Sequence, residues 1–233
     1  MPSRPMLDRS LEAMRDNLLR LTSMVDSAIV RSLRALTERD CNLARQVSAD
    51  DAALNVIRYA VEDSAYTMVA TQQPTGQDLR ATVAAVGVAT NLERMGDHAA
   101  GIARLTLRLC DQPLITTLVD LPHMADVARY MMRDAVDAFL QHDVALAKRV
   151  VAEDAHINRL HANIYNELLT YMTRDPSSIE RATFLLWVSH SLERIGDRSK
   201  NICERAIYVT TGELRDVNEP PTIAKSRPDP EQI

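Results

Sequence analysis

A six-residue motif occurs twice in this chain, and it constrains the fold more than any other feature. Residues 92–97 read LERMGD and residues 192–197 read LERIGD, so five of six positions are identical. Internal repeats of this kind indicate duplicated structural units. Each copy lies in a long segment with helical periodicity, which places its Glu and its Asp four residues apart on one helix face.

The composition favours helices and a packed core. Hydrophobic residues make up 46% of the chain, aromatic residues only 4%, and there are six glycines. Sheets enrich aromatic and β-branched residues, whereas this chain is rich in Ala, Leu, Met, Glu and Arg. No apolar run of about 18 residues is present, so we expect no membrane-spanning helix. The N-terminal residues lack the pattern of a signal peptide, so we expect a cytoplasmic protein.

Charge and cysteine content exclude some functions. The net charge of −5 and the absence of a basic stripe argue against a nucleic-acid partner. The three cysteines, Cys41, Cys110 and Cys203, are far apart and form no CxxC motif. We therefore expect three reduced, buried thiols in a cytosolic protein.

The periodicity predicts six long helices separated by short breaks. Breaks are expected at 39–40, 72–76, 111–113, 142–143, 174–178 and at Gly212. Asp78 is the expected cap of the third helix. The fourth helix is expected to start at about Leu114 or Leu118 and to run to Gln141, and its course around Pro122 is left open. The tail from Leu214 holds four prolines and is expected to be disordered.

The two halves of the chain align beyond the motif. With an offset of 103, eight of twenty positions in 36–55 match 139–158. The sequence therefore predicts an all-α fold of two tandem three-helix bundles. The expected domains are residues 1–111 and 112–213, followed by the tail 214–233.

A second polar pair repeats with the halves. Asp51 and Asn55 in the second helix correspond to Asp154 and Asn158 in the fifth. Counting from each helix turn at about 1.5 Å per residue puts Asn55 opposite Glu93 and Asp51 opposite Asp97. The same count matches Asn158 with Glu193 in the second half. Each half then gathers three carboxylates and one amide, and the full set is Asp51, Asn55, Glu93, Asp97, Asp154, Asn158, Glu193 and Asp197.

Clustered carboxylates repel one another and need a counter-charge. Hard metal ions such as magnesium, manganese or iron suit oxygen ligands. Arg94 and Arg194 are alternatives, since they can either bridge to the carboxylates or bind an anion. Gly96 and Gly196 indicate close approach of a neighbouring helix or of a hydrated ion, because a mid-helix Gly costs roughly 1 kcal/mol against Ala.

Interpretations without a bound ion compete with the metal sites. A single ExxxD pair on a helix is usually a solvated face, although two copies opposite two DxxxN pairs weaken that interpretation. His98 and His156 lie near the acids, but neither has a counterpart in the other half, so neither is expected to be a required ligand.

The chain resembles the PhoU family of regulators of bacterial phosphate uptake. The resemblance is carried by the two LERxGD motifs, by Asp78-Leu79-Arg80 after a Gln-Pro loop, and by the DxxxN pairs, and it covers roughly residues 6–212. It implies two three-helix bundles related by a pseudo-twofold axis, with metal ions at the eight residues named above and no catalytic activity. Asn55 and Asn158 depart from the Asp found there in some relatives, which weakens the ligand set.

The resemblance also implies partners. Such a protein would bind the ATPase subunit of the phosphate transporter and a phosphate-sensing histidine kinase, reach the inner face of the plasma membrane through them, and form homodimers. It would restrain uptake and phosphate-starvation signalling, and its bound ion would be iron, zinc, manganese or magnesium. Two alternatives stay open: a di-iron carboxylate enzyme, disfavoured because the ExxH pairs of that class are absent, and a metal-free helical adaptor.

Overall fold

The computed structural model describes residues 4–113, 115 and 120–213. The described part contains six α-helices and a short 3₁₀ turn, and no strand. The helices are α1 (Arg4–Glu38), α2 (Cys41–Gln72), α3 (Gly76–Leu109), α4 (Asp120–Gln141), α5 (Val144–Arg174) and α6 (Ile179–Thr211). The predicted all-α class is confirmed, and the predicted disorder of 214–233 concerns residues outside those described.

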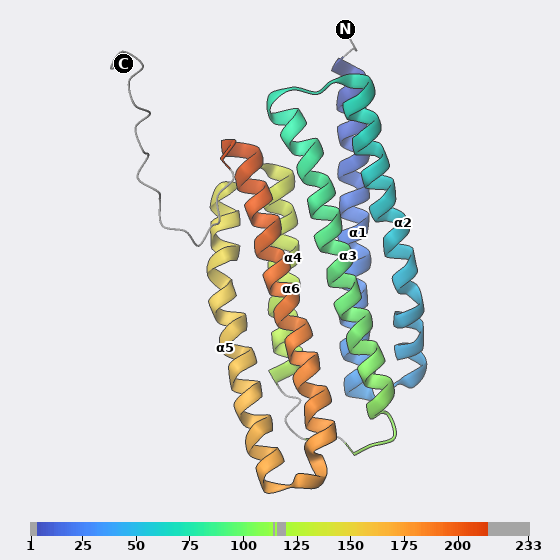
Figure 1. Ribbon diagram of the computed structural model, residues 1–233, viewed down its shortest axis with the longest axis vertical. Coiled ribbons are helices and arrows are strands. Elements are labelled where there is room, and N and C mark those ends of the chain that lie inside the picture. The colour runs from blue at the N-terminus through green and yellow to red at the C-terminus, as the bar shows by residue number, and fades with distance from the viewer. Residues whose placement is uncertain (1–3, 114, 116–119, 214–233) are drawn as a thin grey trace, which may run out of the picture.

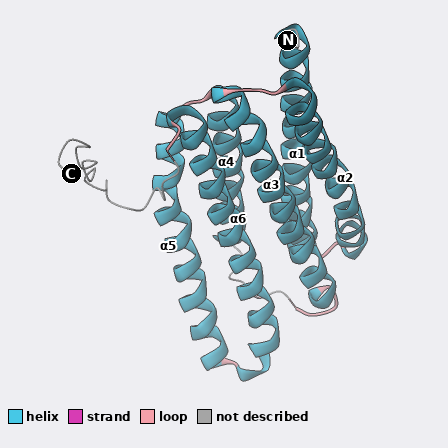
Figure 2. Cartoon of the chain, turned by 45° about the horizontal axis from the view of Figure 1, so that its top comes forward, coloured by secondary structure: helices cyan, strands magenta, loops and turns pink. Residues whose placement is uncertain are grey.

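The helices form two three-helix bundles that lie side by side (Figure 1). Helices α1, α2 and α3 pack on one another, as do α4, α5 and α6. The bundles meet through α3 against α6 and through α1 against α4, while α2 and α5 lie at the two outer sides (Figures 1 and 2). The short connections make consecutive helices antiparallel.

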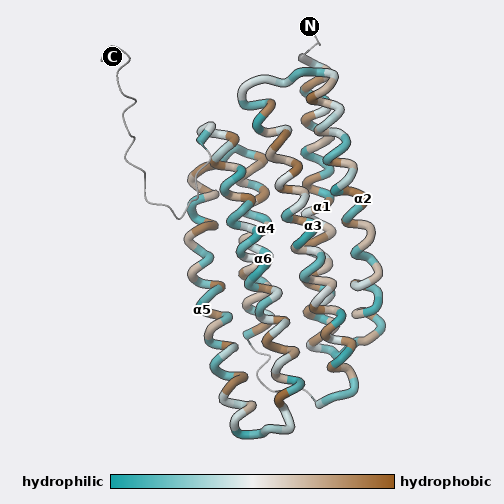
Figure 3. The backbone as a smooth tube through the Cα atoms, viewed as in Figure 1, coloured by the Kyte–Doolittle hydropathy of each residue, from teal (hydrophilic) through white to brown (hydrophobic). Residues whose placement is uncertain are grey.

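One apolar core runs through both bundles. Its buried side chains come from all six helices, and hydrophilic and hydrophobic residues alternate along each helix (Figure 3). Among the described residues, the buried polar side chains are only Ser, Thr and Gln, so no described Asp, Glu or His lies within the core. The acidic motif residues are therefore confined to the outer parts of the bundles.

The repeat sets the helix breaks. Arg39 and His142 both adopt left-handed backbone conformations, with φ of 57° and 56°. Asp40 and Asp143 then cap the next helices, and their carboxylates accept hydrogen bonds from backbone amides of the first turn. The predicted stop at Gly212 is confirmed, because Gly212 caps α6 with φ of 78°.

Two helix starts differ from expectation. The N-cap of α3 is Thr75, and Asp78 lies within the first turn, where its negative charge still favours the helix N-terminus. Helix α4 begins at Asp120 and includes Pro122 in its first turn, where proline is tolerated because the first amides have no intrahelical acceptor. The alternative start at 114 or 118 falls outside the described residues.

An ion-pair cluster joins the two bundles. Asp26 of α1 accepts hydrogen bonds from Arg129 at 2.9 Å and from Arg133 at 2.5 Å, both on α4. Burial alone would raise the pKa of Asp26, but the hydrogen bonds and charges of the two arginines outweigh it and lower that pKa. This pairing fixes α1 against α4 at the seam between the halves.

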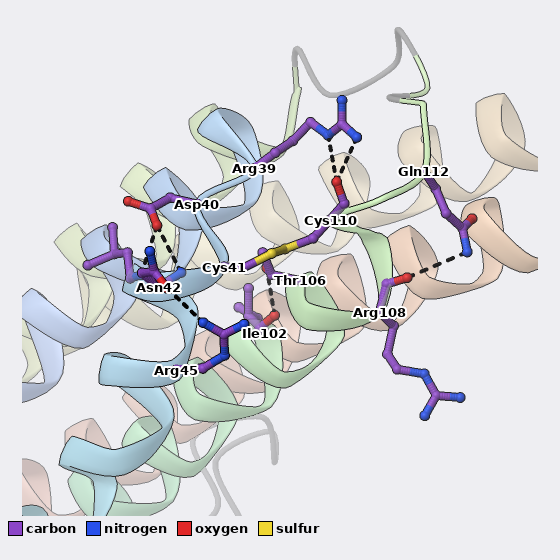
Figure 4. The surroundings of a disulfide bond; sticks show 11 residues. Arg39, Asp40, Cys41, Asn42, Arg45, Ile102, Thr106, Arg108, Cys110 and Gln112 are labelled. Carbon is purple, nitrogen blue, oxygen red and sulfur yellow. Dashed lines mark hydrogen bonds between the residues drawn. A yellow bond between two sulfur atoms is a disulfide. The ribbon is translucent and has the colours of Figure 1, made fainter.

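The expectation of three free thiols is wrong for two of them. Cys41 and Cys110 form a disulfide between the start of α2 and the end of α3, with Cα atoms 6.2 Å apart (Figure 4). Beside it, the guanidinium of Arg39 donates to the carbonyl of Cys110 at 2.6 Å. The antiparallel fold brings both cysteines to one end of the bundle, which their separation of 69 residues does not reveal. Cys203 is free and buried, and burial raises its pKa to about 12.

No helix within the described residues is both long and apolar enough to cross a bilayer.

Candidate functional site

The eight predicted residues form two sets at equivalent places in the two bundles. We call Asp51, Asn55, Glu93 and Asp97 the first acidic set, and Asp154, Asn158, Glu193 and Asp197 the second acidic set. The first lies on α2 and α3, and the second lies on α5 and α6.

The predicted register is observed at the acidic level of the first bundle. Asp51 and Asp97 lie close enough to act electrostatically on one another, and both act on Glu93. Asn55 is half-buried one helical turn from Asp51. Three carboxylates from two helices are thus brought together, as the count along the hairpin predicts.

The motif glycines create the close helix approach that holds this register. A Cβ placed on Gly96 would lie 2.1 Å from the Cδ1 of Leu54, and one on Gly196 would lie 3.1 Å from two carbons of Ile157. Leu54 and Ile157 occupy equivalent positions in α2 and α5. Of the two interpretations of these glycines, the packing supports the neighbouring helix rather than the hydrated ion.

In the first acidic set, burial and like charge outweigh the nearby arginines. Burial raises the pKa of Asp51, and the charge of Asp97 raises it further, against a smaller effect of Arg104. Burial and then Asp97 likewise raise the pKa of Glu93, against smaller effects of Arg58 and Arg94. The Oδ1 of Asp51 is buried without a hydrogen-bond partner. A site in this condition favours the binding of a cation.

The second acidic set is neutralised from within the protein. The Oδ2 of Asp154 accepts hydrogen bonds from the Nζ of Lys200 at 3.0 Å and from the Nδ2 of Asn158 at 3.2 Å. Asp197 is paired with Arg194 at 2.9 Å. The Oδ1 of Asp154 remains buried without a partner, as does the matching atom of Asp51 in the first set.

Glu193 has a different neighbour. Its Oε2 lies 3.3 Å from the Nδ1 of His190 but lacks a hydrogen bond of acceptable geometry. The neighbouring His161 shares a hydrogen bond with the hydroxyl of Ser189, at 2.7 Å from its Nδ1, and not with Glu193. Glu193 is therefore less compensated than the two aspartates of its set.

Lys200 is the residue that sequence reasoning missed. It follows Asp197 by three positions, and the equivalent residue of the first half is Ala100. A position-by-position comparison of the two repeats contains this signal, since a lysine replaces an alanine beside an otherwise shared motif. The internal cation therefore distinguishes two sites that the motifs alone make equal.

The acidic residues are not preassembled around an ion. Within the described residues, no three Asp, Glu, His or Cys side chains are placed so that together they could hold a metal ion. The unpartnered oxygen of Asp51 and the raised pKa values of Asp51 and Glu93 nevertheless fit a hard cation. Asp97 is exposed, so its side chain is free to reorient toward a ligand.

The motif arginines and nearby histidines have distinct surroundings. Arg194 bridges to Asp197, whereas Arg94 lines a groove between α3 and α6 together with Arg198. Burial lowers the pKa of His98, and the charges of Arg198 and Arg194 lower it further, which favours the neutral imidazole. The ring of His156 contacts His123, with centroids 6.0 Å apart.

Comparison with known families and curated proteins identifies the repeat. The family model described as the PhoU domain matches residues 18–106 and again residues 121–206. The phosphate-specific transport system accessory protein PhoU homolog of Clostridium acetobutylicum is 33% identical over 93% of this chain and 100% of its own length. The PhoU protein of Escherichia coli, with the same accessory description, is 32% identical over 87% of this chain and 84% of its own length.

Solved structures agree with the fold. The crystal structure of PhoU from Pseudomonas aeruginosa superposes with a TM-score of 0.84 at 32% identity, covering 88% of this chain and 99% of that one. The phosphate transport system regulatory protein PhoU from Streptococcus pneumoniae gives a TM-score of 0.84 at 31% identity, covering 91% of this chain and 100% of that one.

Proposed function

The chain belongs to the PhoU family, and we propose that it is a non-enzymatic regulator that restrains phosphate uptake and phosphate-starvation signalling. Its relatives are named accessory proteins of the phosphate-specific transport system. The partners that we propose are the ATPase subunit of the transporter and a phosphate-sensing histidine kinase, met at the inner face of the plasma membrane. A homodimer is part of the same proposal.

A metal ion at the first acidic set is the second part of the proposal. The observation that carries it is the buried, unpartnered Oδ1 of Asp51 beside two further carboxylates. Asp51, Glu93 and Asp97 would supply charged oxygen ligands, and Asn55 would supply a neutral one. Iron, zinc, manganese and magnesium are the candidates. The ion would neutralise the set and tie α2 to α3.

The second acidic set is a weaker candidate for the same ion. Lys200 already places a positive charge against Asp154, and Arg194 places one against Asp197. An ion binding there must displace or repel these groups. We therefore propose that the first set binds metal in preference to the second, although the motifs are duplicated.

The outward face of α2 is a candidate surface for a protein partner. Val56, Tyr59, Tyr66 and Val69 are exposed along this helix, with Tyr66 exposed to 65%. Tyrosine is enriched at protein interfaces because its ring buries a large apolar area and its hydroxyl forms a hydrogen bond. Since α2 lies at an outer side of the molecule, this face is accessible in the monomer (Figure 1).

The test of the regulatory proposal is made in the source bacterium. Deleting the coding sequence should raise phosphate uptake and phosphate-starvation transcription in phosphate-rich medium, and the wild-type chain should restore both to low levels. Unchanged uptake and transcription after deletion would contradict the proposal. Full complementation by an Asp51→Asn/Glu93→Gln variant would mean that regulation does not depend on metal at the first acidic set, and the adaptor role alone would remain.

The two alternative functions are a metal-free adaptor and a di-iron enzyme. A metal-free adaptor is favoured by one observation, that the acidic side chains are not preassembled around an ion. The complementation experiment separates this adaptor from the metal-dependent regulator. A di-iron enzyme needs carboxylates that project into the bundle core, whereas the buried polar residues of the described chain are Ser, Thr and Gln.

A further inference from the structure

A basic groove runs along the seam between the two bundles. It lies between α3 and α6, has a volume of about 480 Å³, and is lined on the two sides by Arg94 and by Arg198 and Arg205. This volume falls within the range of about 300–1,000 Å³ that is typical of small-molecule sites. The groove is separate from the acidic sets, none of whose eight residues lines it.

The charge within the groove is positive although the chain carries a net charge of −5. Three arginines line the groove against one carboxylate, that of Glu204. Arg198 lies close enough to Arg94 and Arg194 for their like charges to repel one another. The Nε of Arg198 is buried and has no hydrogen-bond partner. Three guanidinium groups around one concave surface, one of them with a buried, unpartnered nitrogen, favour the binding of an anion.

Small and polar residues keep the middle of the groove open. Gly87 lies beside Arg205, and a Cβ at this position would make only an ordinary contact with its Nε, at 3.8 Å. Asn91 and Asn201 face each other across the seam, with an amide hydrogen bond of 3.4 Å. Both helices thus contribute hydrogen-bonding side chains to one concave surface.

The pseudo-twofold axis does not duplicate the groove. The counterparts of Arg94 and Arg198 are Arg194 and His98. Arg194 is already paired with Asp197, and His98 places an imidazole where the groove has the guanidinium of Arg198. The cationic surface is therefore concentrated at one end of the α3–α6 seam, where Arg205 adds a third charge that the first half, with Leu105, does not repeat.

We propose that this groove binds a small anion carrying two or more phosphate groups. Guanidinium groups bind phosphate oxygens through paired, charge-assisted hydrogen bonds, and their planar forks favour such ligands. Three arginines around one volume of about 480 Å³ match a compact ligand with clustered charge better than a single phosphate. The inference is independent of the metal proposal and goes beyond it.

The test is a calorimetric titration of the full-length, chelator-treated protein with tripolyphosphate at low ionic strength. Removing metal first prevents phosphate from binding through an ion at the acidic sets. Orthophosphate and ATP serve as comparison ligands: orthophosphate should bind more weakly, and ATP shows whether a nucleoside interferes. Saturable binding of tripolyphosphate that weakens with added salt is the expected result.

Arginine variants locate the binding. Arg94→Gln/Arg198→Gln should raise the dissociation constant at least about tenfold, equal to about 1.4 kcal/mol. The single variant Arg205→Gln should also weaken binding and provides a second readout if the double variant is unstable. Arg20→Gln/Arg45→Gln removes the same charge from exposed positions outside the groove and should change the constant less than about twofold.

Three results would overturn the proposal. They are the absence of saturable tripolyphosphate binding to the wild-type chain, an equal loss of binding in the groove and control variants, and capture of an acidic peptide by the groove without binding of tripolyphosphate. The last result would make the groove a protein-docking surface instead.

Discussion

Replacing Lys200 with alanine is expected to make the second acidic set behave like the first. The substitution installs the residue that the first half carries as Ala100. It removes the ammonium group that lies 3.0 Å from the Oδ2 of Asp154. The carboxylate then keeps only the amide of Asn158 as a described hydrogen-bond donor. Asp154 would then lose the direct ion pair that Asp51, its equivalent in α2, does not have among the described residues, where Arg104 acts on Asp51 only through its charge.

The magnitude follows from how far the pair is buried. Exposed ion pairs contribute about 0.2–1 kcal/mol, whereas removing one partner of a buried pair costs about 3–5 kcal/mol. The side chains of Lys200 and Asp154 are 19% and 14% exposed, which places the pair between these limits. We expect Lys200→Ala to lower the free energy of unfolding by about 2 kcal/mol in chelator.

Urea unfolding followed by circular dichroism measures this loss. Lys200→Met retains most of the apolar stem and separates lost packing from lost charge. Lys148→Ala, at an exposed position of α5, is the matched control. Adding the metal that the wild-type chain binds should restore stability to Lys200→Ala and raise its metal content above that of the wild type. Stability within about 0.5 kcal/mol of the wild type, as for ordinary surface substitutions, would refute the reasoning.

Three other substitutions test the packing and the charges. Gly96→Ala should lower the free energy of unfolding, measured by urea unfolding, by about 1 kcal/mol. The overpacking against Leu54 costs about 1–3 kcal/mol, which exceeds the gain of about 1 kcal/mol in helix propensity. Adding Leu54→Ala should relieve the clash, so the effects of the two substitutions should not be additive. Because the pKa of Asp51 is raised in the folded protein, the stability of the metal-free protein falls as the pH rises above the ordinary carboxyl value of 3.8. In thermal unfolding, Asp51→Asn should therefore be more stable than the wild type at pH 7 and should lose that advantage near pH 3. The lowered pKa of Asp26 has the opposite sign: its contribution is present above pH 3.8 and is lost as pH falls below it, so Asp26→Asn should cost about 2 kcal/mol at pH 7 and much less near pH 2.

Much of the fold follows from local sequence signals. The predicted breaks at 39–40 and 142–143 are confirmed, and a capping aspartate is visible in the sequence at each, whereas the left-handed backbone of Arg39 and His142 is known only from the structure. The register of α2 on α3 follows from counting along a hairpin with a short turn, since helix rise is constant. That count correctly places Asp51 against Asp97.

Other features depend on contacts that local patterns do not encode. The Cys41–Cys110 disulfide joins residues brought together only by the closed bundle. The sequence leaves two roles for Gly96, close approach of a neighbouring helix or of a hydrated ion. The position of Leu54 against Gly96 supports the helix. Lys200 changes the second acidic set through a side chain that reaches across to α5, and Arg205 completes the groove at a position that the repeat does not duplicate.

The most direct test of the central claim is elemental analysis of the protein purified without chelator or a metal-affinity column. The wild type, Asp51→Asn/Glu93→Gln and Asp154→Asn/Glu193→Gln are compared, so that each acidic set loses the same two charges. We predict bound metal in the wild type, its loss in the first variant and its retention in the second. Metal absent from the wild type, or lost only when the second acidic set is changed, would contradict the account.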